Sequence, residues 1–362
     1  MQKKPVWRKI LMIVLILILI LVTGLIALVG VTERQFRKAV QAGGANTALM
    51  VVTVNGDGTL QIDGSEILLN PDEPLVMASA MKTVVLAAYA QAVVDGVIDP
   101  QAVVSIPEWE SYYLPGTDGG AHQLGLNSLG FKANPDGTAQ DQAASVSYDD
   151  LARIMMHYSG NAATDVLIAA LGQERLAAAM AAAGMQSHTP ICLLLETTLV
   201  WMNHEDPPQS EAELLTVTDR FHTEGCDSTE WVEKYRSDPV WRKAQIEFLA
   251  AAQTETVDDP VEQWRLAKLT AEILPKGTAR EYAQLLALAA TGNYGSPEVS
   301  GVMQAHLETS PTNGLQRLLF FRRHGEKPGA TAGVLTEVSY AVPKWGQHKG
   351  ETRVVVILAN EL

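Results

Sequence analysis

The sequence predicts an α+β protein in which an antiparallel β-sheet is built from both ends of the chain, with flanking helices and an inserted all-helical subdomain. Strand-like runs occur at 47–54 and 59–69 near the start and at 315–321, 334–342 and 353–359 near the end. Helical patterns occupy the stretch between them. Because the strands enclose the helices, one sheet assembled from the two ends accounts for this order.

Composition limits the class of protein and of partner. The 362 residues are 47% hydrophobic and 19% charged, which is ample for a sizeable core. The net charge is −14, and the first 30 residues carry Lys and Arg but no acid, so the rest of the chain is more negative still. Nucleic acid and anionic lipid headgroups are therefore unfavourable partners.

The N-terminal segment has the pattern of a membrane anchor. Its apolar run at 10–31, about 22 residues long, can cross a bilayer as a helix. Basic residues at positions 3, 4, 8 and 9 precede this run and should stay cytoplasmic, which places the following chain outside the cytoplasmic membrane. A cleaved signal peptide has a shorter apolar core and a clearer small-x-small site. We therefore predict a retained single-pass anchor within 1–31, in the cell membrane, and a folded extracytoplasmic domain at 32–362.

Local signals place the first elements of this domain. Asn55-Gly56-Asp57-Gly58 between the first two strand-like runs is a strong hairpin signal. An apolar run of good helix formers at 74–94 ends at Asp95-Gly96, as a helix stop should. The Gly- and Pro-rich stretch 106–138 then predicts a long loop.

The middle of the chain is predicted to be helical. Ser147-Tyr148-Asp149-Asp150 resembles a capping box. An acidic, aromatic-bearing stretch at about 203–275 forms the predicted insertion, where Asp238-Pro239 and Asp259-Pro260 each look like an N-cap followed by a first-turn proline. Other helices are expected at 147–157, 161–171, 174–183 and 278–290.

Ser79 and Lys82 are the first candidates for chemistry. They lie three residues apart in the apolar run 74–94, where Lys82 is the only charge, so the amine can reach the serine oxygen on one helix face. Burial lowers the pKa of a lysine and makes it a possible proton acceptor for a serine nucleophile. In the alternative interpretation, Ser79 is a helix cap and Lys82 extends its amine to solvent.

Two further motifs follow in an order that matters. Ser159-Gly160-Asn161 lies between two predicted helices, and Lys327-Pro328-Gly329 follows a predicted strand. Together with the Ser79 motif, they resemble the S-x-x-K, S-x-N and K-T/S-G signature of the serine β-lactamase and penicillin-binding protein superfamily. The stretches 147–151 and 159–165 look like the class A version, as do Gly277-Thr278-Ala279-Arg280 and Asn313-Gly314-Leu315.

The resemblance implies a role for each motif residue. Ser79 would be the acylated nucleophile, Lys82 its general base or proton relay, and Ser159 the donor of a proton to the departing nitrogen. Substrate would be bound by Asn161, Lys327, Gly329, Ala330 and Thr331, with the N–H groups of Ser79 and Ala330 as the oxyanion hole. Alternatively, Ser159 or Asn161 caps a helix and Lys327 is an edge-strand charge. Lys344-Trp345-Gly346 also fits K-x-G but is followed by one strand only, so it ranks second.

Three departures from the family pattern concern substrate binding and deacylation. Pro328 replaces the hydroxyl residue that the family uses for a substrate carboxylate, with Thr331 as a possible substitute, and Gly160 replaces the usual aspartate. Glu196 is at about the position of the class A glutamate that activates the deacylating water, but Val200 replaces the asparagine that should follow. Glu196 could be this catalytic base or a residue on the surface of a helix.

Cysteine and histidine usage adds little chemistry. Cys192 and Cys226 could form one bridge, while a buried free Cys192 is an equal alternative. The eight histidines form neither H-E-x-x-H nor a Cys/His cluster, so the sequence predicts no metal site, and no cofactor is implied.

The sequence thus predicts a membrane-anchored serine hydrolase of the class A β-lactamase type. It would open a β-lactam, or another cyclic or peptide-like amide, through an acyl-enzyme. Two alternatives stay open: a D,D-peptidase or esterase on the same scaffold, and a catalytically silent module that binds cell-wall fragments. The partner in each case is a small-molecule substrate or cell-wall peptide.

Overall fold

The computed structural model describes residues 44, 46–226, 229–254, 260–309 and 314–360. The predicted anchor at 10–31 lies outside these residues, and the start of the predicted domain at 32–43 does too. None of the described helices has the length and apolarity that a bilayer crossing needs.

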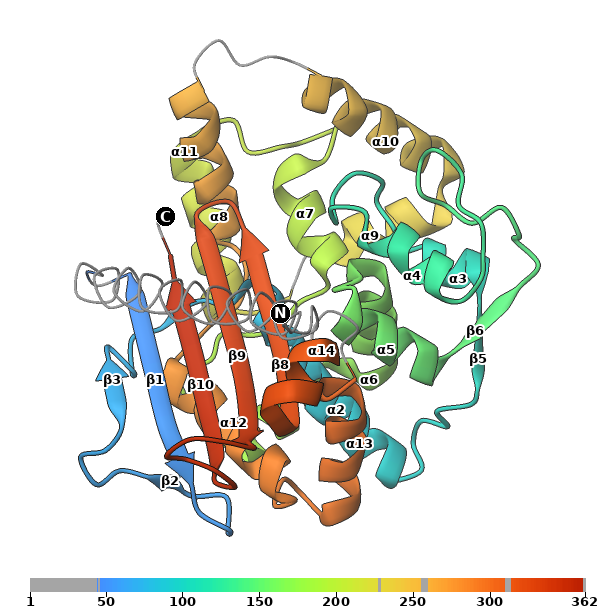
Figure 1. Cartoon of the computed structure of the whole chain (residues 1–362). Helices are drawn as coiled ribbons and strands as arrows, with labels where there is room; N and C mark the ends of the chain where they lie inside the picture. Colours follow the sequence, from blue (N-terminus) through green and yellow to red (C-terminus); the bar gives the residue numbers. More distant parts are fainter. Residues whose placement is uncertain (1–43, 45, 227–228, 255–259, 310–313, 361–362) are drawn as a thin grey trace, which may run out of the picture. The chain divides into compact units, whose positions relative to one another are not determined.

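One antiparallel sheet joins the two ends of the described chain, as predicted (Figure 1). Its strand order is β2-β1-β10-β9-β8, and β3 also pairs with β1. The registers place Thr47 opposite Ala359 and Thr331 opposite Val334. The strands of this sheet are β1 (Thr47–Val54), β2 (Leu60–Gln61), β3 (Ile67–Leu69), β8 (Phe321–Thr331), β9 (Val334–Pro343) and β10 (Thr352–Ala359).

The hairpin signal at 55–58 is confirmed, but the second predicted strand is interrupted. Only β2 and β3 pair with β1 within the predicted run 59–69. Asp63 lies between them and accepts hydrogen bonds from the backbone and side chain of Ser65, forming a local turn.

Two short strand pairs and the helices complete the described elements. The pairs are β4 (Leu75–Val76) with β7 (Lys276–Gly277), and β5 (Val103–Ser105) with β6 (Ser145–Ser147). The helices are η1, a 3₁₀ turn (Ala78–Met81), α2 (Lys82–Val94), α3 (Ile106–Glu110), α4 (Ala121–Ser128), α5 (Tyr148–His157), α6 (Asn161–Ala182), α7 (Leu194–Met202), α8 (Glu211–Thr223), α9 (Thr229–Ser237), α10 (Pro239–Thr254), α11 (Pro260–Ala271), α12 (Ala279–Thr291), α13 (Pro297–Leu307) and α14 (Gly314–Phe320).

The core lies between the sheet and the helices. Helix α2 is apolar on nearly all sides and is buried along most of its length, as a helix enclosed by other elements should be. It contacts α6 and α13, while α12 packs on β10 and β1. The described part of the insertion at about 203–275 is mainly helical and contains α8 to α11, of which α10 and α11 lie at the top of Figure 1.

The structure corrects three predicted elements. Residues 315–321 are not a strand, because α14 occupies Gly314–Phe320 and the strand begins at Phe321. The predicted helix 74–94 starts with β4 and η1, so Ser79 lies on a 3₁₀ turn and α2 begins at Lys82. The predicted loop 106–138 contains the short helices α3 and α4.

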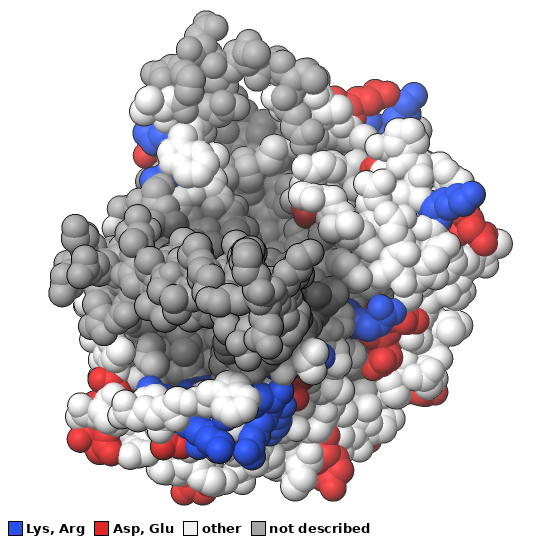
Figure 2. All heavy atoms as spheres, in the orientation of Figure 1, with Lys and Arg blue, Asp and Glu red and all other residues white. Residues whose placement is uncertain are grey.

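The described surface shows no single dominant charge on the face drawn in Figure 2. Asp and Glu side chains lie at several separate places on this face and are interspersed with Lys and Arg. Elsewhere among the described residues, exposed side chains form ion pairs, such as Arg280 with Asp72 and Lys234 with Glu205. Such exposed ion pairs contribute little to stability. Buried charged groups are therefore the more informative candidates for a functional site.

Candidate active site

The structure brings the three sequence motifs together around the Lys82 amine. Lys82 is fully buried, and its Nζ lies 3.2 Å from Ser79 Oγ, 2.6 Å from the Ser159 carbonyl and 2.7 Å from Asn161 Oδ1. Ser159 Oγ is 3.3 Å from the same nitrogen. The alternative interpretation therefore fails, because Lys82 does not reach solvent and Ser79 is not a helix cap: it lies inside η1, and the N-caps of η1 and α2 are Met77 and Met81.

The surroundings of Lys82 favour a neutral amine. Burial lowers its pKa well below the ordinary value of 10.5, and the nearby positive charge of Lys327 lowers it further. A neutral amine has two N–H groups and one lone pair. If the N–H groups donate to the two nearest acceptors, the carbonyl of Ser159 and Oδ1 of Asn161, the lone pair is left for the Ser79 hydroxyl proton.

Lys327 supplies the second buried cation of the site. It is 2% exposed, and its Nζ donates to Ser159 Oγ at 3.0 Å and to the Pro328 carbonyl at 2.9 Å. Burial lowers its pKa to about 8. The Ser159 hydroxyl thus lies between two amines, where it can pass a proton from Lys82 to a leaving group. This contact also removes the interpretation of Lys327 as an exposed edge charge.

The backbone is strained at Ser159 and at the residue directly before Ser79. Ser159 has a φ of 64°, and Ala78, directly before Ser79, has a φ of 44°. Side-chain-bearing residues adopt this left-handed region at a cost, which is common where geometry serves a function. The strain at Ser159 coincides with the contacts of both its carbonyl and its hydroxyl with Lys82.

Gly160 departs from the family motif for a steric reason. A Cβ atom at this position would lie 2.8 Å from the Ile154 side chain of helix α5. An aspartate therefore has no space here unless Ile154 moves. Asn161, the next residue, still begins α6 and reaches Lys82.

The hairpin of β8 and β9 presents Ala330 to the site. A two-residue turn, Ala332-Gly333, closes this hairpin, so hydrogen-bonded pairs alternate from Thr331 and Val334 onward. Pro328 and Ala330 fall at the positions whose N–H would point away from β9, which suits a proline. Strand β8 is outermost in the sheet of the described residues, so the Ala330 N–H points outward from its edge.

Gly329 lets this strand approach the nucleophile. A Cβ atom here would lie 2.7 Å from Ser79 N, 2.8 Å from Ala80 N and 2.5 Å from Thr336 Oγ1. The hydroxyl of Thr336 in turn donates to the Met77 carbonyl at 2.9 Å, which ties β9 to the start of η1. The close contact of β8 with η1 brings the strand that carries Ala330 to the Ser79 backbone, consistent with the predicted oxyanion hole.

A cavity of about 680 Å³ opens above these groups. Ser79, Ser159, Asn161 and Lys327 line it, as do Gly329, Ala330 and Thr331. All predicted substrate-binding residues therefore face one space, and Pro328 lines it too. Lys344-Trp345-Gly346, the second-ranked K-x-G match, lies on the connection between β9 and β10 and is not among the described residues that line the cavity.

Glu196 is the predicted catalytic residue that the structure does not bring to the cavity. Helix α7 turns Leu194, Thr197, Thr198 and Trp201 toward the cavity, which is a helical stripe that excludes position 196. The Glu196 side chain is 1% exposed, and its carboxylate lies within 4.8 Å of the sulfur atoms of Cys192 and Cys226. It is thus a buried residue on the other side of α7, not one on the surface of a helix.

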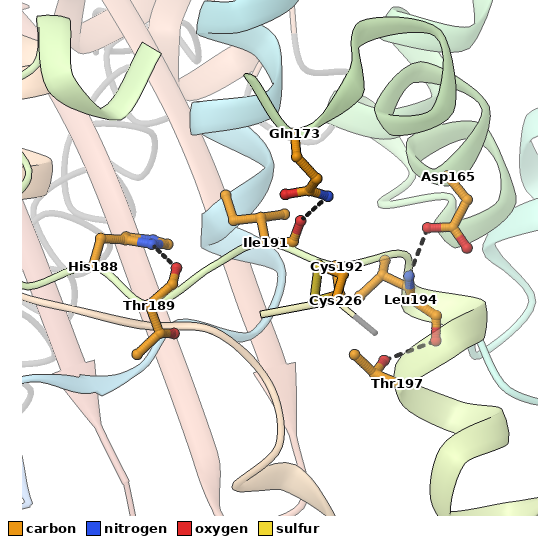
Figure 3. Close-up of a disulfide and its surroundings, with 9 residues drawn as sticks. All are labelled: Asp165, Gln173, His188, Thr189, Ile191, Cys192, Leu194, Thr197 and Cys226. Atoms are coloured by element: carbon orange, nitrogen blue, oxygen red, sulfur yellow. Dashed lines mark hydrogen bonds between the residues drawn. A yellow bond between two sulfur atoms is a disulfide. The ribbon is translucent and has the colours of Figure 1, made fainter. Parts of the chain in front are cut away.

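Cys192 and Cys226 form a disulfide, which resolves the alternatives left by the sequence (Figure 3). The bond joins the segment before α7 to the segment after α8. Beside it in Figure 3, Asp165 of α6 points at the start of α7 and accepts the N–H groups of Leu194 at 2.7 Å and Leu195 at 2.8 Å. Burial raises the pKa of Asp165 to about 7.

Sequence reasoning missed several residues around the cavity. Asp118, Trp201, Glu326 and Leu335 line it, as do residues of the insertion between 270 and 274. The spacing of Leu194, Thr197, Thr198 and Trp201 was the available signal, because residues 3, 4 and 7 apart share a helix face. The insertion residues approach the site only through the tertiary fold, and the local sequence carries no signal for that.

Comparisons with known proteins agree with this geometry. A family model described as beta-lactamase enzyme family matches residues 32–222. Among curated proteins, no sequence matches the chain significantly.

Solved structures share the fold at low sequence identity. A β-lactamase from Sphaerobacter thermophilus is 16% identical, with a TM-score of 0.50 over 90% of this chain and 88% of that chain. A penicillin G acyl-enzyme complex of a PBP-A mutant is 14% identical, with a TM-score of 0.51 over 91% and 87%. A β-lactamase from Chitinophaga pinensis is 10% identical, with a TM-score of 0.51 over 91% and 90%. The superfamily resemblance predicted from the motifs is confirmed, and the chain belongs to the beta-lactamase enzyme family.

Proposed function

We propose that this protein is a serine hydrolase in which Ser79 is acylated by β-lactams and related cyclic or peptide-like amides. The observation that carries the proposal is the buried Lys82 amine, held at hydrogen-bond distance from both Ser79 and Ser159 beneath an open cavity. A binding module needs no such arrangement, so the silent alternative has the weakest support.

Acylation follows from the positions of the hydrogen bonds. Neutral Lys82 takes the Ser79 proton as Oγ attacks the amide carbonyl, and the N–H groups of Ser79 and Ala330 stabilise the oxyanion. Collapse of the tetrahedral intermediate breaks the C–N bond. The leaving nitrogen takes the Ser159 proton, which Lys82 replaces, and the positive charge of Lys327 stabilises an anionic substrate group.

Deacylation is proposed to be slow. A water molecule that attacks the acyl-enzyme needs a general base near Ser79, and the resemblance to class A enzymes implies a glutamate in this role. In this chain, Thr197 and Thr198 of α7 line the cavity and Glu196 does not. The position of Glu196 beside the disulfide therefore favours the second candidate, a penicillin-binding D,D-peptidase or esterase on the same scaffold. Class A β-lactamase turnover is the less favoured form of the same chemistry.

Fluorescent penicillin labelling of the full-length chain, purified in detergent, tests the proposal. We expect covalent label on the wild type and none on Ser79→Ala. Lys82→Arg puts a permanently charged guanidinium in place of the base, so its labelling rate should fall about 10² to 10⁴-fold. Equal labelling of Ser79→Ala and wild type would refute the assignment of the nucleophile.

We also propose that residues 10–31 anchor the chain in the cytoplasmic membrane with the enzyme domain outside. The apolar run and its basic flank support this, and the Cys192–Cys226 disulfide supports an oxidising compartment for the domain. In intact spheroplasts, added protease should remove the domain from the membrane fraction. A protected domain would argue for a cytoplasmic location.

A further inference from the structure

The active-site cavity has two chemically different ends. Ser159 and Lys327 lie at one end and supply the proton and the positive charge. Away from these two residues, the lining includes the large apolar side chains of Trp201, Met202, Ile273, Leu274 and Leu335, with threonines between them. Lys327 is the only Lys or Arg among the described residues that line the cavity.

The polar end fixes the direction in which a substrate lies. The leaving nitrogen has to be near Ser159 Oγ, because this hydroxyl donates its proton. The acyl substituent of the carbonyl then extends the opposite way along β8, past Ala330 toward Thr331. Thr331 lies four positions after Lys327, about 13 Å along an extended strand, which is room for a side group of considerable size.

The insertion lies at the Thr331 end of the strand. A Cβ atom on Gly333, at the tip of the β8–β9 hairpin, would be 2.8 Å from the Lys268 side chain of α11. Ala271, at the end of α11, is buried in a cluster with Val76, Ala78 and Val334. The apolar residues Ile273 and Leu274, which follow α11, are thus fixed where an acyl group would arrive.

Trp201 completes this wall from helix α7. It packs against a buried cluster of Cys192, Val200, Phe221 and Ile273, in which α7, α8 and the segment after α11 meet at the disulfide. Trp201 itself is half-buried and lines the cavity. Leu335 of β9 faces the same space and is 52% exposed, a large apolar surface beside a catalytic serine.

We propose that Trp201, Ile273, Leu274 and Leu335 form a subsite for the acyl group of the substrate. It takes amides with a bulky aromatic or branched aliphatic acyl group and disfavours small or anionic ones, because these four residues offer apolar contact and no cation. This assignment rests on the proposed acylation of Ser79 and specifies its substrate class.

Two penicillins that differ only at the acyl position test the subsite. Benzylpenicillin carries a phenylacetyl group, whereas 6-aminopenicillanic acid has a free amine in its place. With the full-length chain in detergent, second-order acylation constants are measured for both by intact mass. We expect the wild type to prefer benzylpenicillin at least tenfold. Trp201→Ala and Leu335→Ala should each lower its constant about five- to tenfold and change that of 6-aminopenicillanic acid less than twofold.

A matched variant and a stability measurement complete the experiment. Trp264→Ala removes an indole that is 49% exposed on α11 outside the cavity, and should change neither constant. Should Trp201→Ala fail to fold in a thermal melt, Leu335→Ala decides, because its side chain lies largely in solvent. An unchanged ratio in folded variants would overturn the subsite while acylation stands. A wild type that neither penicillin acylates would instead overturn the proposed function.

Discussion

At the scale of single residues, two buried lysine side chains have their amines beside the hydroxyl of one serine, Ser159. Lys82 is fully buried and Lys327 is 2% exposed, so burial lowers the pKa of both amines, and the charge of Lys327 lowers the pKa of Lys82 further. Catalysis uses the two amines in opposite states. Lys82 has to be neutral to take a proton, and Lys327 has to be charged to stabilise an anion.

The pH dependence of acylation should show the charge on Lys327. Because burial lowers its pKa to about 8, the charged form is lost as the pH rises through 8, and the acylation rate should fall there. Arginine stays protonated. Lys327→Arg should therefore move this alkaline decline upward by more than one pH unit, whatever its effect on the maximal rate.

The measurement is the rate of penicillin acylation between pH 6 and 10 for both proteins. Thermal melts at each pH show whether the variant is folded. If both proteins decline at the same pH near 8, a group other than Lys327 causes the decline.

The motif residues were predictable from the sequence because the chemistry requires particular residue types at short, constant spacings. Ser79 with Lys82, and Ser159 with Asn161, lie within one turn of each other, so their local order carries the signal. Glu196 shows the limit. Its spacing from Asn161 fitted the family, but the rotation of α7 decides which residues face the cavity, and this rotation is set by tertiary contacts such as those of Asp165.

At the scale of elements, the site depends on how close β8 comes to η1. Gly329 is the contact point, and backbone atoms of Ser79 and Ala80 leave no space for a side chain there. The sequence predicted a strand at 315–321, where α14 is found, because a short apolar run fits a buried strand and a helix equally well. The true strand holds His324, Glu326 and two glycines, a composition that local propensity disfavours.

Gly329→Ala should separate the strand from the nucleophile. The added methyl group would lie 2.7 Å from Ser79 N, so β8 or η1 has to shift, and the oxyanion hole widens. We expect the acylation rate to fall about 10² to 10³-fold. Gly301→Ala on α13 is the matched control, since among the described residues no atom outside its own helix backbone and chain neighbours lies within 4 Å of the added methyl group. A Gly329→Ala variant with the wild-type rate would contradict the close approach.

Asp165 links α6 to α7, and its burial lowers the free energy of unfolding by an amount that depends on pH. The folded state favours its protonated form, with a pKa of about 7 against an ordinary value of 3.8. This group therefore destabilises the protein progressively as the pH rises from about 4 to about 7. Asparagine resembles the protonated acid and has no charge to bury.

The melting temperature of Asp165→Asn relative to wild type should accordingly increase between pH 4.5 and pH 8. Differential scanning calorimetry at pH 4.5, 6 and 8 measures the difference. A difference that is constant across this range would mean that Asp165 is ionised in the folded protein throughout.

At the scale of the whole molecule, the class of fold was predictable from the sequence, because strand-like runs near both ends of the chain can pair in one antiparallel sheet. The helical nature of the insertion followed from its caps. The contribution of the insertion to the cavity was not predictable from the sequence. Ile273 and Leu274 meet Trp201 only because α7, α8 and α11 pack around the disulfide.

The disulfide should stabilise the cavity wall. It closes a loop across a sequence separation of 34 residues. The lost entropy of the unfolded chain raises the free energy of unfolding by about 3 to 4 kcal/mol. Replacing Cys192 and Cys226 together by Ser should lower the free energy of unfolding by about this amount. Urea denaturation measures it, with wild type in reductant as the comparison. Equal midpoints for oxidised wild type and the double variant would show that the bond contributes nothing.

In the proposed reaction, Ser79 forms an acyl-enzyme that water attacks slowly. Time-resolved intact mass of the full-length chain mixed with benzylpenicillin tests it most directly. We expect an adduct of one penicillin, mapped to Ser79 by peptide digestion, that persists after free antibiotic is removed. Intact antibiotic with no adduct would contradict acylation, whereas rapid loss of antibiotic without a lasting adduct would contradict slow deacylation.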